Sequence, residues 1–188
     1  MDQFAVAGAS YGGLVAFRYA STRTSRVTAL ILQNSAGIEY GGRGGTTERP
    51  RDPDAQFEPS PVTEDGMETI LNIVINDPEV VTPELITRKT DFNNLVGRDC
   101  EAFLARQLYE RGNPQRVLEQ VRAPALVLWG GGNKALSLST ADAFANGLKN
   151  AAVVRKIIHD GGGHLLHIER PEATSRDVKA FLDTHLAR

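Results

Sequence analysis

The stretch Phe4-Ala5-Val6-Ala7-Gly8-Ala9-Ser10-Tyr11-Gly12-Gly13 decides the fold. It begins with apolar residues that do not alternate with polar ones, which is typical of a strand buried on both faces of a parallel sheet. Glycines then mark a sharp turn, and the apolar residues that follow as far as Tyr19 have helical spacing. The stretch therefore predicts a strand, a tight turn that holds Ser10, and a helix.

The strand and helix patterns continue along the rest of the chain. Apolar runs predict further strands at residues 27–32, 125–129 and 152–158. Helices are expected at about residues 139–148 and 171–186. Because strands alternate with helices, the sequence predicts an α/β fold, in which a parallel sheet carries helices on both faces.

The middle of the chain has a different composition. Residues 41–61 are rich in glycine, proline and charged residues and predict an irregular loop; an RNA-binding glycine–arginine segment is the less favoured alternative. Three helical patterns follow, at about residues 63–75, 83–95 and 99–111, and Thr82 before Pro83 is a typical helix start. We expect three parts: core residues 1–40, a helical insert at 41–118, and core residues 119–188.

Length and composition exclude several classes of protein. The 188 residues suit one compact domain, and 41% hydrophobic with 23% charged residues is ordinary for a globular protein. A net charge of −2 argues against nucleic-acid binding, and no apolar run could span a bilayer. Cys100 is the single cysteine, and the first residues lack a signal peptide. We expect a cytoplasmic protein with a small-molecule substrate and no nucleic-acid or membrane partner.

Residues 8–12 form the pattern G-x-S-x-G between an expected strand and an expected helix. The sharp turn strains the backbone at the serine, and small residues two positions away on either side relieve the crowding. Ser10 then stands near the positive end of a helix dipole, where the backbone N–H of Tyr11 can donate to an oxyanion. Ser10 is the expected nucleophile; the alternative is a glycine-rich turn with an incidental serine.

His164 is the expected general base. It lies in Asp160-Gly161-Gly162-Gly163-His164, directly after the last expected strand, so its loop can reach the mouth of the sheet. A neutral imidazole there can take the proton of Ser10 and return it to the leaving group.

The other histidines are expected to be structural. We expect His167 and Glu169 to hold the turn into the last helix, and His159 and His185 to lie at the surface. The spacing of His164 and His167 is not that of the helical zinc motif. No metal and no organic cofactor is expected.

These motifs together resemble the α/β-hydrolase superfamily over nearly the whole chain. The core segments look like the nucleophile strand of that family and the three strands after it, and the insert looks like its helical cap domain. The resemblance implies a partial α/β-hydrolase fold, a parallel sheet with a helical cap insert. Residues 76–86 and 163–171 are most similar to hydrolases of the meta-cleavage-product type, which break a carbon–carbon bond in ring-fission products.

The resemblance places the acid of the family, in a W-G-x-x-D pattern, at Asn133, which ends Trp129-Gly130-Gly131-Gly132-Asn133. A carboxylate there fixes the histidine tautomer and stabilises the imidazolium, and in a serine protease the change from Asp to Asn costs about 10⁴ in kcat. Asn34, at the alternative acid site of the family, is neutral too. We expect Asn133 to orient His164 weakly.

The resemblance also suggests a substrate site in the insert. A cap arginine of the family helps to hold an anionic substrate, and Lys89 falls at that place with Arg88 beside it. A solvated helix face is the alternative for both side chains. The second oxyanion donor of the family comes from a loop before the elbow, which this sequence does not contain.

Two functions follow from the sequence. The first is a serine-dependent hydrolase of a small ester or keto (C–C) substrate, N-terminally truncated, with Met1 an internal methionine of a longer parent. The second is a catalytically impaired fragment or pseudoenzyme binding module of the same fold. The first strand would form an exposed sheet edge in either case, which predicts a homo-oligomer through that edge.

Overall fold

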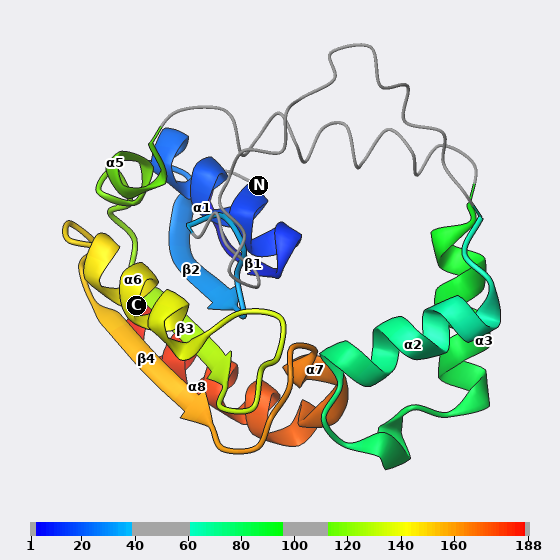
Figure 1. Ribbon diagram of the computed structural model, residues 1–188. Helices are drawn as coiled ribbons and strands as arrows, with labels where there is room; N and C mark the ends of the chain where they lie inside the picture. The colour runs from blue at the N-terminus through cyan, green and yellow to red at the C-terminus, as the bar shows by residue number, and fades with distance from the viewer. Residues whose placement is uncertain (1–2, 39–60, 96–112, 187–188) are drawn as a thin grey trace, which may run out of the picture.

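Four parallel strands form the sheet at the centre of the computed structural model (Figure 1), which describes residues 3–38, 61–95 and 113–186. Their spatial order is the order of the sequence. They are β1 (Phe4–Ala9), β2 (Val27–Gln33), β3 (Ala125–Gly130) and β4 (Val154–His159). The parallel sheet expected from the sequence is confirmed.

Helices cover both faces of the sheet. On one face, α1 (Tyr11–Thr22) and α6 (Leu138–Gly147) share a core cluster with alternate residues of β2 and β3. The short α5 (Pro114–Leu118) contacts α1 on this same face. The other face of the sheet packs against α8 (Pro171–Leu186). The two inner strands are almost wholly buried because each is flanked by strands and covered by helices.

The first strand is an edge strand, as predicted, and is therefore less buried than its apolar run alone indicates. Residues of β1 alternate between exposed and half-buried, since β1 lies at the end of the strand order and pairs only with β2 among the described strands. The apolar run therefore reflects its place in a parallel sheet, but its burial is that of an edge strand.

Three aromatic side chains fill the core beneath α1 and α6. Phe17, Phe144 and Trp129 are fully buried, and the rings of Phe17 and Phe144 meet edge to face at 5.7 Å between centroids. Trp129 packs against Phe144 at 6.2 Å. Truncating such a residue to alanine typically costs about 3–5 kcal/mol, so this cluster fixes α1, and the residue before it, against the sheet.

Residues 61–95, the part of the expected insert that is called the insert from here on, form two helices and a turn. They are α2 (Glu64–Val74), the 3₁₀ helix η1 (Pro78–Val80) and α3 (Pro83–Asn93). The side chain of Thr82 accepts a hydrogen bond from the N–H of Leu85, which confirms the predicted helix start at Thr82 and Pro83. The helix expected at 99–111 and the loop expected at 41–61, apart from Pro61, lie outside the described residues.

One apolar cluster joins the insert to the core. Met67 and Leu71 of α2, and Ile75 directly after it, are buried against Leu165 and Ile168. Leu165 directly precedes α7 (Leu166–Glu169), and Ile168 lies in it. Figure 1 shows α2 running toward α7 at the edge where the strands end. The insert thus meets the core at the loop that carries His164. No described helix is long and apolar enough to cross a membrane.

Candidate active site

The backbone of Ser10 is strained at the junction of β1 and α1. Its φ is 51° and its ψ is −121°, a conformation that a residue with a side chain adopts at a cost of about 1–3 kcal/mol. The N–H of Ser10 donates to the carbonyl of Gln33, and its own carbonyl accepts from Gly13 and Ala36. These bonds to β1's neighbour and to α1 hold the strained turn, and the strain expected at this serine is confirmed.

Of the two motif glycines, Gly8 and Gly12, only Gly8 stands where a side chain would clash, whereas the motif suggests that both do. A Cβ added at Gly8 would lie 2.1 Å from the carbonyl oxygen of Gly12, whereas one added at Gly12 meets nothing within 4 Å. The second crowded position is Gly13, where a Cβ would lie 2.2 Å from Oγ of Ser35. Gly12 therefore crowds Gly8 with its backbone, and its own lack of a side chain relieves no contact.

Tyr11 is the first residue of α1. Backbone N–H groups in the first turn of a helix point out of its N-terminal end, toward the region where Ser10 stands. This direction is the one that an oxyanion donor requires. The role of the Tyr11 N–H stays a prediction.

His164 is buried in the loop after β4, with 7% of its surface exposed. Its N–H donates to the carbonyl of Val74 in the insert at 2.7 Å, and its ring Nδ1 has no hydrogen-bond partner among the described residues. Burial, followed by the nearby His167, lowers the pKa of His164 below its usual value. The imidazole is therefore neutral at pH 7, as a general base must be.

Asn133 makes contacts other than the expected one with the imidazole. Its Oδ1 accepts from the backbone N–H groups of Ala135 and Leu136 at 3.0 and 3.1 Å. Its Nδ2 is buried without a partner among the described residues, as is Nδ1 of His164. The side chain closes the turn after β3, as asparagine does in Asx turns, and no hydrogen bond joins it to the imidazole.

Asn34 is a residue that the sequence did not single out for this role. It is fully buried with a φ of 43°, and its Nδ2 donates to the carbonyls of Gly163 and His164 at 3.1 and 2.7 Å. Its Oδ1 accepts from the N–H of Gly130 at 2.9 Å. One amide thus ties the end of β2 to the end of β3 and to the histidine loop. The available signal was a polar residue directly after a buried apolar run.

The side chains of Glu169 and His167 make contacts beyond the turn into α8, which the expectation for these residues does not include. The carboxylate of Glu169 accepts from Gly163 and from the insert. Nδ1 of His167 lies 2.7 Å from Nε2 of Gln33 at the end of β2. Partial desolvation of its ring, and then the charge of Lys89, lower the pKa of His167.

The expectation that His159 lies at the surface is wrong. Its side chain is only 11% exposed, because β4 packs it toward α8, where its Nε2 lies 3.1 Å from Oδ2 of Asp177 without hydrogen-bond geometry. His185 is half-buried, and its ring centroid is 4.6 Å from that of Phe181.

The two basic residues of α3 have different surroundings. The side chain of Arg88 is 76% exposed and lies 3.9 Å from Glu84 one turn earlier, which is a solvated helix face. Lys89 is partly buried, and its charge reaches His167. Of the two residues predicted to bind substrate, only Lys89 is electrostatically coupled to a residue of the core.

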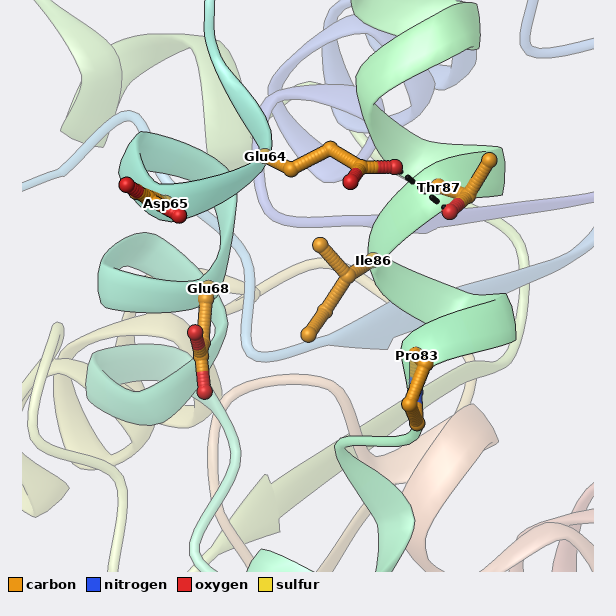
Figure 2. A pocket seen from close by; sticks show the side chains of 6 residues that line it. All are labelled: Glu64, Asp65, Glu68, Pro83, Ile86 and Thr87. Carbon is orange, nitrogen blue, oxygen red and sulfur yellow. Dashed lines mark hydrogen bonds between the residues drawn. The ribbon is translucent and has the colours of Figure 1, made fainter.

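A separate groove lies between α2 and α3 (Figure 2). Its volume is about 270 Å³, and it is lined by Glu64, Asp65, Glu68, Pro83, Ile86 and Thr87. Glu64 accepts a hydrogen bond from Thr87 across the groove at 2.6 Å. Neither Ser10 nor His164 lines it. Within the described ranges, no group of three or more His, Cys, Asp or Glu residues could hold a metal ion.

Comparisons with known proteins agree with this geometry. The chain is 24% identical over 188 residues to monoacylglycerol lipase ABHD6 of Homo sapiens, covering 95% of this chain and 54% of the relative. It is 25% identical over 201 residues to a 2-hydroxy-6-oxononadienedioate/2-hydroxy-6-oxononatrienedioate hydrolase of Paraburkholderia xenovorans (strain LB400), covering 97% and 63%. The chain therefore spans between half and two-thirds of the length of these two relatives.

One solved structure has the same fold, and one family model matches most of the chain. The meta-cleavage product hydrolase CumD of Pseudomonas fluorescens IP01 superposes with a TM-score of 0.77 at 18% identity, covering 97% of this chain and 65% of that one, and so shows the same fold. The model of the alpha/beta hydrolase family matches residues 1–177, which include both Ser10 and His164. With a parallel sheet, a strained serine before α1 and this match, the chain belongs to the alpha/beta hydrolase family.

Proposed function

We propose that this chain carries the nucleophile and the general base of a serine-dependent hydrolase that acts on a small ester or keto (C–C) substrate. Ser10 is the nucleophile and His164 the base. The observation that carries the proposal is the strained backbone of Ser10 at the head of α1, held by hydrogen bonds to the next strand and helix. Such strain is maintained where the surrounding structure enforces it, and it is concentrated at functional sites.

The reaction follows from the chemistry of these groups. Oγ of Ser10 attacks the substrate carbonyl carbon while its proton passes to the neutral imidazole of His164. The charge that forms on the carbonyl oxygen is stabilised by the N–H of Tyr11. His164 then gives the proton to the leaving group, and a water molecule activated by the same imidazole releases the acyl group from Ser10. With a keto substrate, Ser10 and His164 can instead activate water directly.

Lys89 is proposed to bind an anionic group of the substrate. Its ammonium is partly buried and close enough to lower the pKa of His167, whereas Arg88 is exposed beside Glu84. The Paraburkholderia relative is named for its action on 2-hydroxy-6-oxononadienedioate, which is a carboxylate. Lysine acts as a point charge without the bidentate fork of arginine. It would therefore attract an anionic group of the substrate without fixing the orientation of that group.

One observation favours the second candidate, a catalytically impaired member of the family or a binding module. Asn133 supplies no charge, its oxygen is occupied by the N–H groups of Ala135 and Leu136, and Nδ1 of His164 has no partner among the described residues. An imidazolium formed during turnover would lack its usual stabilisation.

Labelling with a fluorophosphonate probe distinguishes the two candidates. The folded chain, the Ser10→Ala variant and a heat-denatured sample are treated in parallel, and circular dichroism verifies the fold. Labelling that is lost in both controls supports an activated Ser10. A folded chain that is not labelled contradicts the hydrolase and favours the binding module.

Two further parts of the proposal concern the setting of the protein. The single Cys100, which cannot pair within the chain, supports a cytoplasmic location. The outer edge of β1 is proposed to pair with a second copy of the chain, because an edge strand presents backbone N–H and C=O groups that can bind another strand. Light scattering after size exclusion tests this pairing: a mass about twice 20.4 kDa supports it, and the mass of one chain contradicts it.

A further inference from the structure

The carboxylate of Glu169 bridges two segments that are distant in sequence. Its Oε1 accepts from the N–H of Gly163 at 3.0 Å, and Gly163 directly precedes His164. Its Oε2 accepts from the N–H groups of Asn76 and Asp77, at 3.0 and 3.4 Å, where the chain leaves α2. One side chain therefore holds both the histidine loop and the end of the insert helix.

Two other contacts lie at the same junction. The carbonyl of Val74 accepts from the N–H groups of His164 and Leu165 at 2.7 and 3.3 Å. The side-chain amide of Asn76 donates to the carbonyls of Gly132 and Gly161 at 2.8 and 3.2 Å. The end of α2 is thus bonded to the histidine loop on both sides of His164 and to the turn after β3.

The charge of Glu169 makes this contact costly unless it is fully satisfied. The residue is 8% exposed, and no ion pair is found for it among the described residues. A buried carboxylate without a cation is tolerated where backbone N–H groups take up its charge, and hydrogen bonds to a charged acceptor are shorter and stronger than neutral ones. The three N–H donors fulfil this requirement. If α2 moved away from the loop, the buried carboxylate would lose two of its three hydrogen-bond donors.

We propose that Glu169 is a positioning residue, which couples the seating of the insert to the position of the His164 imidazole. When the insert is seated, the carboxylate holds Gly163 and the end of α2 together, and His164 is fixed through its own N–H. When the insert shifts, Gly163 loses its acceptor and the imidazole loses its fixed place. The catalytic part of this coupling rests on the proposed function; the mechanical part does not.

The first test is independent of activity. Glu169→Gln keeps the volume but replaces one acceptor oxygen by a donor, so one of the two links is lost. Glu172→Gln, at an exposed position in the first turn of α8, is the matched control. The imidazole of His164 is titrated by NMR, with its signal assigned from a His164→Gln variant. We expect its pKa to rise toward its ordinary value in Glu169→Gln by about half a unit or more, since a released ring is better solvated.

Hydrogen exchange measures the same link in the backbone. We expect the amides of Gly163, His164 and Asn76 to exchange about tenfold faster in Glu169→Gln, and to be unchanged in the control. A purely structural role would lower the melting temperature without moving the pKa of His164. An unchanged pKa and unchanged exchange in a folded Glu169→Gln protein overturn the proposal.

A second variant and a labelling experiment complete the test. If Glu169→Gln does not fold, Glu169→Asp is used instead, because its carboxylate is one methylene shorter and cannot reach both Gly163 and the end of α2. The same shift of pKa and exchange is expected in that variant, and its absence there overturns the proposal. Where Ser10 of the unmodified chain reacts with fluorophosphonate, the labelling rate should fall about tenfold in Glu169→Gln. If Ser10 is unreactive, the proposed function fails, while the titration and the exchange still decide the coupling.

Discussion

The side-chain amide of Asn34 donates a hydrogen bond of 2.7 Å to the backbone carbonyl of His164. The same amide binds Gly163 and accepts from Gly130, so one fully buried side chain connects the ends of β2 and β3 to the histidine loop. The position of the proposed base is therefore set on the sheet side by Asn34 and on the other side by Glu169, which bonds the histidine loop to the insert. Neither residue contacts the imidazole ring through these bonds, and both act through the backbone around it.

The Asn34→Asp variant should be strongly destabilised. Aspartate can still accept from Gly130, but it would place an oxygen against the carbonyls of Gly163 and His164 in a fully buried site. We expect a loss of about 3 kcal/mol or more in the free energy of unfolding, measured with urea. Asn94→Asp is the control, because Asn94 makes the same kind of contacts to Val62 at an exposed position and should change stability by less than about 1 kcal/mol. Equal losses in both variants would refute this explanation.

The Asn133→Asp variant should activate Ser10. One carboxylate oxygen can keep the bonds to Ala135 and Leu136, and the second becomes available to Nδ1 of His164, which has no partner among the described residues. We expect the rate of fluorophosphonate labelling to rise at least about tenfold, within the roughly 10⁴ that the reverse change costs a serine protease. Asn133→Gln serves as the control, and a rate that is the same in all three proteins would count against the hydrolase proposal.

The two glycines of the elbow should respond differently to alanine. Gly8→Ala brings a Cβ to 2.1 Å from the backbone of Gly12, which cannot move without breaking the turn, and should cost about 3 kcal/mol or prevent folding. Gly12→Ala meets nothing within 4 Å in the first turn of α1 and should be neutral or stabilising by up to about 1 kcal/mol. Thermal unfolding of the pair is the measurement; similar melting temperatures would contradict the prediction.

Relief of the strain at Ser10 should stabilise the protein. Glycine adopts a φ of 51° without the steric cost that any Cβ brings, so Ser10→Gly should exceed Ser10→Ala in stability by about 1 kcal/mol. Both variants remove the hydroxyl, and therefore differ only in the Cβ. Urea unfolding of the two proteins checks the difference, and a less stable glycine variant would show that the turn is not under strain.

The lowered pKa of His164 predicts a pH dependence of both reactivity and stability. The base must be neutral to accept a proton, so labelling of Ser10 should remain at its plateau down to pH values below the usual pKa of about 6.5 and then decline. Because the unfolded chain takes up a proton more readily than the folded one, stability should fall as the pH drops from about 6.5 toward the folded pKa. His164→Gln should remove this component of the acid destabilisation, and an unaltered pH profile would exclude His164 as its source.

The fold was predictable because its signals are local. Apolar runs mark β2 and β3, the glycines on either side of Ser10 mark the passage from β1 into α1, and Thr82 with Pro83 marks the start of α3. Each signal identifies a short element without reference to the rest of the chain. The burial of β1 does not follow from its apolar run, since it depends on how many neighbours the strand has, but the edge position predicted for this strand accounts for it. His159 was misplaced for a related reason: its burial depends on α8.

The site was predictable only where a motif marks it. Ser10 and His164 stand in glycine-rich turns after strands, and the strain at Ser10 follows from the motif itself. The contacts of Asn34, and those of Glu169 with the insert, join residues about 90 to 130 positions apart, and the sequence carries no periodic signal for them. Asn133 was read as a partner of the imidazole, but its contacts are with the two residues that close its own turn.

That turn after β3 requires one oxygen from the side chain at position 133, and aspartate has that oxygen as well as asparagine. Codons for the two amino acids differ by a single first-position base, so a gene can pass from one to the other in one mutational step. Because either side chain can keep the turn folded, the replacement of aspartate by asparagine at this position is reversible in evolution. A lineage that carries it retains the scaffold on which selection could restore the charge.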